Sequence, residues 1–235
     1  MKKKSVVNLD KIAKSTAILA SNTSSISITR LASATSRPQQ VMLSLYALYE
    51  SSSNNKRAGN EWVSGLGKKL SSLKLVEIVR GADTSDNTFY ATKALAERQL
   101  TGGLNFEQKN VVTFGKIVIC SQDFSGFVVI RILMPMVNEA FHALYTGVAT
   151  KEDIETGMKL GTNHPMGPLE LADFIGLDVC LSIMRVLHAG LGDGKYSPCP
   201  LLVQYVDAGR LGKKRGIGVY DYRKMPESLK PSSRL

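Results

Sequence analysis

The chain has 235 residues, of which 43% are hydrophobic and 21% charged, so it suits one large globular domain or two small ones and is not wholly disordered. Its 30 basic and 20 acidic residues give a formal charge of +10, which suits either nucleic acid or a phosphate-bearing small substrate. Aromatic residues make up only 7% and do not interleave with the basic clusters, so we expect no nucleic-acid binding. No run of about 18 apolar residues is present, so we expect no membrane span.

The three cysteines are odd in number and lack metal-ligand spacing; they are Cys120, Cys180 and Cys199. We predict free thiols in a reducing compartment and no metal site. The sequence ends Ser233-Arg234-Leu235, which has the small–basic–Leu form of a peroxisomal targeting signal. We therefore expect a peroxisomal protein, or a cytoplasmic one if this short match is fortuitous.

The first 124 residues alternate between helical and strand patterns. We predict, in chain order, a helix over 3–14, a buried parallel strand over 17–20, a helix reaching Ala32, a strand over 73–79, a helix from Thr84 or Ser85 to about 98, and a strand over 116–120. The polar residues 21–25 follow the first strand, at the kind of position where open α/β sheets place ligands.

Two segments break this alternation. Residues 42–73 turn polar and low in complexity after a short apolar start, and residues 99–113 contain two glycines and no hydrophobic period. We predict that both are insertion-like and disordered or looped.

From residue 125 to about 210 the pattern is helical throughout. We predict a helix over 127–145 with Pro135 inside it, a second after Thr150, and a third that opens at Gly167-Pro168 and continues past Cys180. The predicted fold class is therefore α/β followed by all-α, with domains at 1–124 and 125–223 and a tail at 224–235.

Seven stretches carry a recognisable family pattern: Ala20–Thr29, Lys74–Val79, Asp123–Phe127, Arg131–Pro135, Met158–Gly161, His164–Asp173 and Lys213–Asp221. With them the chain resembles the L-3-hydroxyacyl-CoA dehydrogenases, and most of all the 3-hydroxybutyryl-CoA dehydrogenases. The resemblance covers roughly residues 1–41, 74–98 and 114–223. It implies a partial Rossmann-type NAD-binding domain and a helical C-terminal dehydrogenase domain that forms a homodimer.

The resemblance also implies a reaction, a cofactor and site residues. A hydride passes between C3 of a 3-hydroxyacyl-CoA substrate and NAD in fatty-acid β-oxidation or butanoate metabolism. Ser24 matches the serine that contacts the substrate hydroxyl and the nicotinamide, and Asn22 lies in the same cofactor-facing motif. Glu77 matches the carboxylate that orients the catalytic histidine, while Lys2 and Lys214 match lysines that contact the cofactor.

Each of these assignments has a structural alternative. Ser24 could cap the helix that follows it. Glu77 could be a strand carboxylate facing solvent, and Lys214 could belong to a solvated turn. The chain's histidines all have structural interpretations; they are His142, His164 and His188.

The sequence departs from the family at three places. It has no counterpart of the Gly-x-Gly-x-x-Gly loop, since the similar spacing at Gly212–Gly218 does not open a helix. Residues 42–73 replace the family segment that holds the catalytic histidine, and they contain no histidine. Ile130 stands where the family has a substrate-positioning asparagine, and isoleucine makes no hydrogen bond. We therefore expect weak or absent activity, or alternatively a non-catalytic fragment that dimerises with a full-length homologue.

Overall fold

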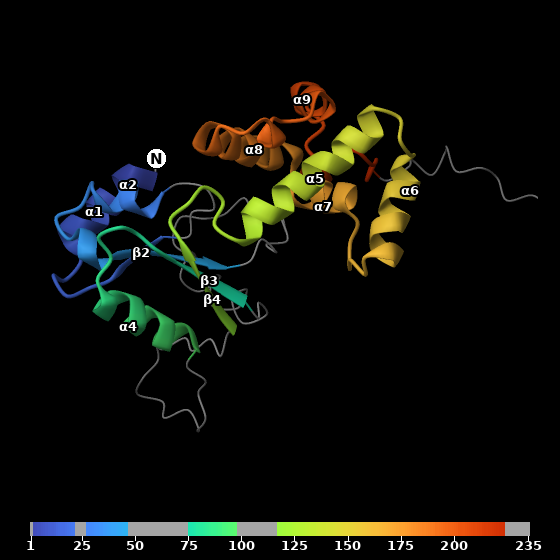
Figure 1. Ribbon diagram of the computed structural model, residues 1–235. Coiled ribbons are helices and arrows are strands. Elements are labelled where there is room, and N and C mark those ends of the chain that lie inside the picture. The colour runs from blue at the N-terminus through green and yellow to red at the C-terminus, as the bar shows by residue number, and fades with distance from the viewer. Residues whose placement is uncertain (1, 22–26, 47–74, 98–116, 224–235) are drawn as a thin grey trace, which may run out of the picture. The chain divides into compact units, whose positions relative to one another are not determined.

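The computed structural model describes residues 2–21, 27–46, 75–97 and 117–223 (Figure 1). The predicted insertion at 99–113, most of the predicted insertion at 42–73 and the tail with its targeting tripeptide lie outside these residues. The chain divides into two compact units. The first holds most residues up to Leu133 together with Ala189–Gly192, and the second holds most residues from Met134 onward.

The first unit is built on a four-stranded sheet in the order β1-β2-β3-β4. β1 (Leu19–Ser21) pairs in parallel with β2 (Val41–Tyr46), which confirms the predicted parallel strand. β3 (Leu75–Arg80) runs antiparallel to β2 and parallel to β4 (Ile117–Gln122). The sheet is therefore mixed, and β1 and β2 run opposite to β3 and β4.

The strand β2 corrects one prediction. The loop predicted over 42–73 is wrong for residues 42–46, which form most of β2. The reason is the apolar start of this segment, because Val41 and Met42 are buried in the sheet and pair with β1, and residues 43–46 continue the strand and pair with β3. Residues 47–73 lie outside the described part.

Among the described residues, the α-helices that lie wholly in the first unit are α1 (Lys2–Ile12), α2 (Ile28–Ala32) and α4 (Asp86–Glu97). The Oγ of Ser85 accepts a hydrogen bond from the N–H of Thr88 at 3.2 Å, so Ser85 caps α4 as predicted. The cap of α2 is Ser27, whose Oγ accepts from the N–H of Arg30 at 3.2 Å. The α2 cap is thus Ser27 and not Ser24.

Helix α4 lies along the sheet and covers part of its core (Figure 1). Met42, Val76 and Ile78 are fully buried and cluster with Ala96 of α4, and Phe89 and Val118 pack against this cluster. Strands contribute alternate side chains to each face, so residues two apart such as Val76 and Ile78 share the face that α4 covers.

The helices beyond β4 are α5 (Val129–Tyr145), α6 (Lys151–Thr156), α7 (Pro168–Ile175), α8 (Leu177–Leu191) and α9 (Pro200–Asp207). A π turn at Gly157–Gly161 follows α6 directly. Thr150 caps α6, since its Oγ1 accepts from the N–H of Asp153 at 3.1 Å. Large fully buried side chains fill the core of the second unit; they include Met134, Phe141, Leu169, Leu177, Leu181 and Met184.

The third predicted helix is wrong in its length. It does not continue past Cys180 but ends at Ile175, and α8 begins after Gly176 at an angle of 99°. Gly176 has a φ of +105°, a conformation that L-residues with side chains rarely adopt, so the glycine allows the sharp change of direction. Among the described residues no single helix is long and apolar enough to cross a membrane, although α7 and α8 together meet that length and composition.

Candidate functional site

Glu77 lies in the middle of β3 and is buried, with 1% of its surface exposed. Its Oε1 accepts a hydrogen bond from the N–H of Val128 at 2.7 Å, and its Oε2 accepts from the N–H of Val129 at 3.4 Å. These are N–H groups at the start of α5, which have no acceptor within the helix. The interpretation of Glu77 as a solvent-facing carboxylate is therefore wrong.

The position of Glu77 defines what its carboxylate can do. The oxygens face the positive end of a 17-residue helix, which stabilises a negative charge there. Each carboxylate oxygen has two lone pairs, so Glu77 can accept a further N–H while it caps α5. Such a carboxylate suits the orientation of an imidazole, but the chain's first histidine along the sequence is His142, in the last turn of α5.

Asp123 follows β4 directly and holds the start of α2. Its Oδ1 accepts from the N–H of Ile28 at 2.9 Å, and its Oδ2 accepts from the N–H of Thr29 at 2.8 Å and from the hydroxyl of Ser27 at 2.7 Å. Burial raises the pKa of Asp123, but these hydrogen bonds to the ionised form outweigh it and leave the pKa lowered.

Sequence reasoning missed this role of Asp123. The residue belongs to a family stretch and directly follows a predicted strand, which is a signal for a carboxylate at a sheet end. By holding Ser27, Asp123 fixes the chain one residue after the segment 22–26, which carries the predicted Asn22 and Ser24. That segment lies outside the described residues, so both assignments stay predictions. Lys2 begins α1, and its side chain is likewise not described.

Ile130 is fully buried in the first turns of α5. An isoleucine has no hydrogen-bonding group, so this position supplies packing where the resemblance implies a polar contact with substrate.

Lys214 lies in a 3-10 turn, Lys213–Arg215, between two glycines with positive φ, Gly212 and Gly216. Its Nζ donates to Oδ1 of Asp178, in the first turn of α8, at 2.5 Å. The spacing Gly212–Gly218 thus opens a three-residue turn and not an α-helix, as predicted. Lys214 is partly exposed and belongs to the second unit, whereas Glu77 belongs to the first.

Asp173 of α7 anchors the segment that follows this turn. Its Oδ1 accepts from the N–H of Val219 at 2.9 Å, and its Oδ2 accepts from the N–H of Tyr220 at 2.9 Å and from the hydroxyl of Tyr222 at 3.0 Å. A Cβ on Gly218 would lie 1.9 Å from Oδ1 of Asp173, so only glycine fits there. Two family stretches that are far apart in sequence are therefore joined by one buried carboxylate.

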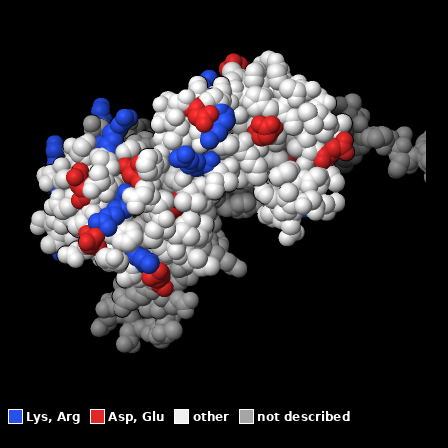
Figure 2. Space-filling view, in the orientation of Figure 1, with Lys and Arg blue, Asp and Glu red and all other residues white. Residues whose placement is uncertain are grey.

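Among the described residues we find no second candidate site built on a charged patch, a metal-binding cluster or a reactive thiol. Basic and acidic side chains are interspersed on the face shown in Figure 2. No group of three or more His, Cys, Asp or Glu side chains in the described ranges could hold a metal ion. The three cysteines are free thiols, and burial raises the pKa of Cys180 to about 12, which makes that thiol unreactive.

Two family models match the chain. Residues 1–46 match the NAD binding domain of 3-hydroxyacyl-CoA dehydrogenase, and residues 126–222 match the C-terminal domain of the same enzyme. The chain is 48% identical over 223 residues to a 3-hydroxybutyryl-CoA dehydrogenase of Bradyrhizobium diazoefficiens, covering 95% of this chain and 64% of the relative. It is 49% identical over 214 residues to a probable 3-hydroxybutyryl-CoA dehydrogenase of Bacillus subtilis, covering 91% of this chain and 62% of the relative.

A solved structure agrees with these matches. The crystal structure of (S)-3-hydroxybutyryl-CoA dehydrogenase from Ralstonia eutropha is 42% identical, with a TM-score of 0.75, and the match covers 95% of this chain and 66% of that one. The chain thus spans a little under two thirds of the length of the curated relatives named above. Its fold is a Rossmann-like NAD-binding domain followed by a helical domain, and the chain belongs to the 3-hydroxyacyl-CoA dehydrogenase family.

Proposed function

We propose that this chain is an impaired NAD-dependent dehydrogenase of L-3-hydroxyacyl-CoA substrates, 3-hydroxybutyryl-CoA among them. The observation that supports the proposal is the match of both family domains, in order, along one chain. The buried Glu77 is consistent with it, because its carboxylate is held by α5 and retains lone pairs for another donor. The impairment follows from two departures from the family. Ile130 stands where the family has a substrate-positioning asparagine, and residues 42–73, which replace the segment with the catalytic histidine, contain no histidine.

The residues present fit NAD in part. Lys214 offers an ammonium to a phosphate, and β1 ends at Ser21 just before the predicted contacts Asn22 and Ser24. The sequence contains no Gly-x-Gly-x-x-Gly loop opening a helix, so it lacks that cradle for the pyrophosphate. When bound, NAD supplies the hydride acceptor; the chain's own contribution is to hold the substrate oxygen through Ser24, while Glu77 holds the start of α5.

The first test is NADH oxidation by the purified chain with acetoacetyl-CoA, followed by the loss of nicotinamide absorbance. We expect turnover at least a hundredfold below a typical enzyme's ~10 per second, because loss of a general base alone removes about 10²–10⁴ in rate. Turnover within tenfold of that typical value would show that another group replaces the histidine and would overturn the proposed impairment.

A binding test separates cofactor recognition from chemistry. Titration of the chain with NADH, followed by nicotinamide fluorescence, is expected to saturate, with a weakened affinity because the glycine-rich loop is absent. A linear response with no saturation would overturn the proposed NAD binding, whatever the turnover assay shows.

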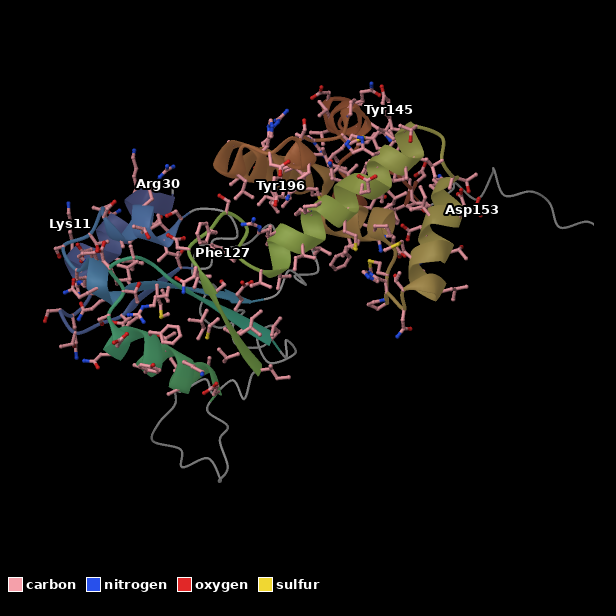
Figure 3. All side chains as sticks on the ribbon, in the orientation of Figure 1. Lys11, Arg30, Phe127, Tyr145, Asp153 and Tyr196 are labelled. Atoms are coloured by element: carbon pink, nitrogen blue, oxygen red, sulfur yellow. The ribbon has the colours of Figure 1, made fainter. Side chains whose placement is uncertain are left out.

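A second candidate function is a dimerising partner, either of a second copy or of a full-length homologue. A pocket of about 460 Å³ lies between α5 and the segment formed by α6 and its π turn. It is lined mainly by small and apolar groups: Met136, Ala140, Ala143, Ile154, Gly157, Met158 and Pro168, with Glu139 and Asp153 also in its wall. Figure 3 shows Tyr145 near the end of α5 and Asp153 on α6, the two helices that form this surface.

Three apolar side chains at the end of α5, after it and in the π turn are also more than half exposed: Tyr145, Val148 and Leu160. Exposed apolar groups of this kind are typical of an interface, and the same elements of a second C-terminal domain would offer matching groups. Light scattering of the unaltered chain should give the mass of a dimer. Ala143→Glu, which places a charge in the pocket, should give the mass of a monomer. The control Ala91→Glu, on the exposed side of α4, should still give a dimer. A monomer mass for the unaltered chain contradicts this candidate.

A further inference from the structure

The tip of Lys214 occupies a fitted position at the junction of α7 and α8. Its Nζ donates to Oδ1 of Asp178, and a Cβ on Gly176 would lie 2.9 Å from that Nζ and 3.2 Å from Cε of the same lysine. Carbon and nitrogen atoms that are not bonded do not approach so closely without displacement, so a side chain at position 176 would push the ammonium away. Gly176 therefore leaves room for the ammonium, and Asp178 accepts its hydrogen bond.

Residues on both sides of Lys214 in the sequence contact Asp173 of α7. Asp173 is fully buried and accepts hydrogen bonds from the N–H groups of Val219 and Tyr220. A Cβ on Gly212 would lie 2.2 Å from the backbone oxygen of Asp173, so the turn approaches α7 as closely as glycine permits. The segment that carries Lys214 is thus anchored on α7, and its ammonium is hydrogen-bonded to α8.

We propose that Asp178 is a positioning residue that holds the Lys214 ammonium ready for a phosphate of the dinucleotide, an inference that rests on the proposed function. An ammonium has three N–H donors, and Asp178 takes one. The Lys214 side chain is 33% exposed, which leaves room for a ligand oxygen beside the carboxylate. A free lysine side chain loses rotamer entropy when it is ordered, so ordering it beforehand lowers the cost of binding.

A purely stabilising ion pair would not require this arrangement. Partly exposed Lys–Asp pairs contribute little to folding and form on many protein surfaces. Here the pair is combined with a glycine whose missing side chain makes the ammonium's position possible, at a φ of +105°. The negative charge of Asp178 itself opposes an anionic ligand, so the proposed benefit lies in its hydrogen bond and not in its charge.

That distinction gives opposite expectations for two substitutions. Asp178→Ala removes the acceptor and should raise the dissociation constant for NADH by about 3- to 10-fold. Asp178→Asn keeps an acceptor oxygen without the charge, so its dissociation constant for NADH should be equal to that of the unaltered chain or lower. Asp193→Ala is the matched control, because it removes another exposed Lys–Asp pair, with Lys195 at 3.3 Å, and should leave NADH binding unchanged.

The experiment is a fluorescence titration of the full chain with NADH for each variant, repeated in a Lys214→Met background. Because Asp178 acts through Lys214, Asp178→Ala should not change the dissociation constant for NADH any further once Lys214 is methionine. Equal NADH affinity of the unaltered chain and Asp178→Ala, or an equal effect in both backgrounds, overturns the inference and leaves the proposed function intact. No saturation by the unaltered chain overturns the proposed function and the inference with it.

Discussion

A Cβ atom on Gly167 would lie 1.9 Å from Oε2 of Glu155. Glu155 belongs to α6 and is buried, with Oε1 accepting from the N–H of Leu169 at 2.7 Å and of Glu170 at 3.2 Å. These N–H groups open α7, so a carboxylate from one helix caps the next. The space beside Gly167 is where that carboxylate fits, which gives the glycine before Pro168 a structural reason.

Gly167→Ala should destabilise the chain by about 1–3 kcal/mol, because the new methyl group displaces the buried carboxylate from its N–H partners. Urea unfolding measures this change. The control is Gly157→Ala, since a Cβ at Gly157 meets nothing within 4 Å and the backbone there is helical. Equal urea midpoints for the two variants would contradict the proposed role of Glu155.

Much of the fold could be predicted from local pattern. The caps at Ser85 and Thr150 follow from residue type, and the alternation in 73–79 marks β3, because these signals act over a few residues. The break at Gly176 was missed because an apolar helical period continues across it. Only the tertiary approach of Lys214 and the φ of +105° distinguish that glycine from one inside a helix.

The site was predicted less completely, for a related reason. Family resemblance points to Glu77, but strand alternation alone suggested solvent, since nothing local reveals that α5 begins at its carboxylate. Asp123 and Asp173 act on segments 94 and 46 residues away in sequence, at Thr29 and Val219. Such contacts depend on the assembled fold and leave no periodic trace in the sequence.

Asp123 should make the first unit sensitive to acid. Hydrogen bonds lower its pKa below the ordinary 3.8, so the ionised form is favoured in the folded state. The stability it supplies is therefore complete above pH 3.8 and is lost as the pH falls through the lowered value. Thermal midpoints should be lower for Asp123→Asn than for the unaltered chain at pH 7 and should converge as the pH falls below the lowered pKa of Asp123. Asp83→Asn, at an exposed carboxylate, is the control, and parallel curves for Asp123→Asn and the unaltered chain contradict the assignment.

Tyr222→Phe should loosen the segment that Asp173 anchors. The tyrosine hydroxyl donates to Oδ2 of Asp173 at 3.0 Å, and a hydrogen bond to a charged group contributes about 1.5–3 kcal/mol. Burial already raises the pKa of Asp173, and the loss of a donor to the ionised form should raise it further. Urea unfolding at pH 7 should show the loss. Tyr90→Phe, on the exposed face of α4, should not, and a loss of the same size there would remove the support for a specific anchor.

Glu77 provides the last test, because its capping bond to α5 is distinct from any role in catalysis. Glu77→Ala leaves the N–H groups of Val128 and Val129 without their acceptor and should destabilise the chain by about 1–3 kcal/mol. Glu77→Gln keeps an oxygen for the shorter bond, at 2.7 Å, and should lose about 1 kcal/mol or less. Glu97→Gln, at the exposed end of α4, is the control for loss of charge alone. Urea midpoints ordered unaltered chain, Gln, Ala from highest to lowest are expected, and an Ala variant as stable as the unaltered chain would show that the carboxylate does not hold α5.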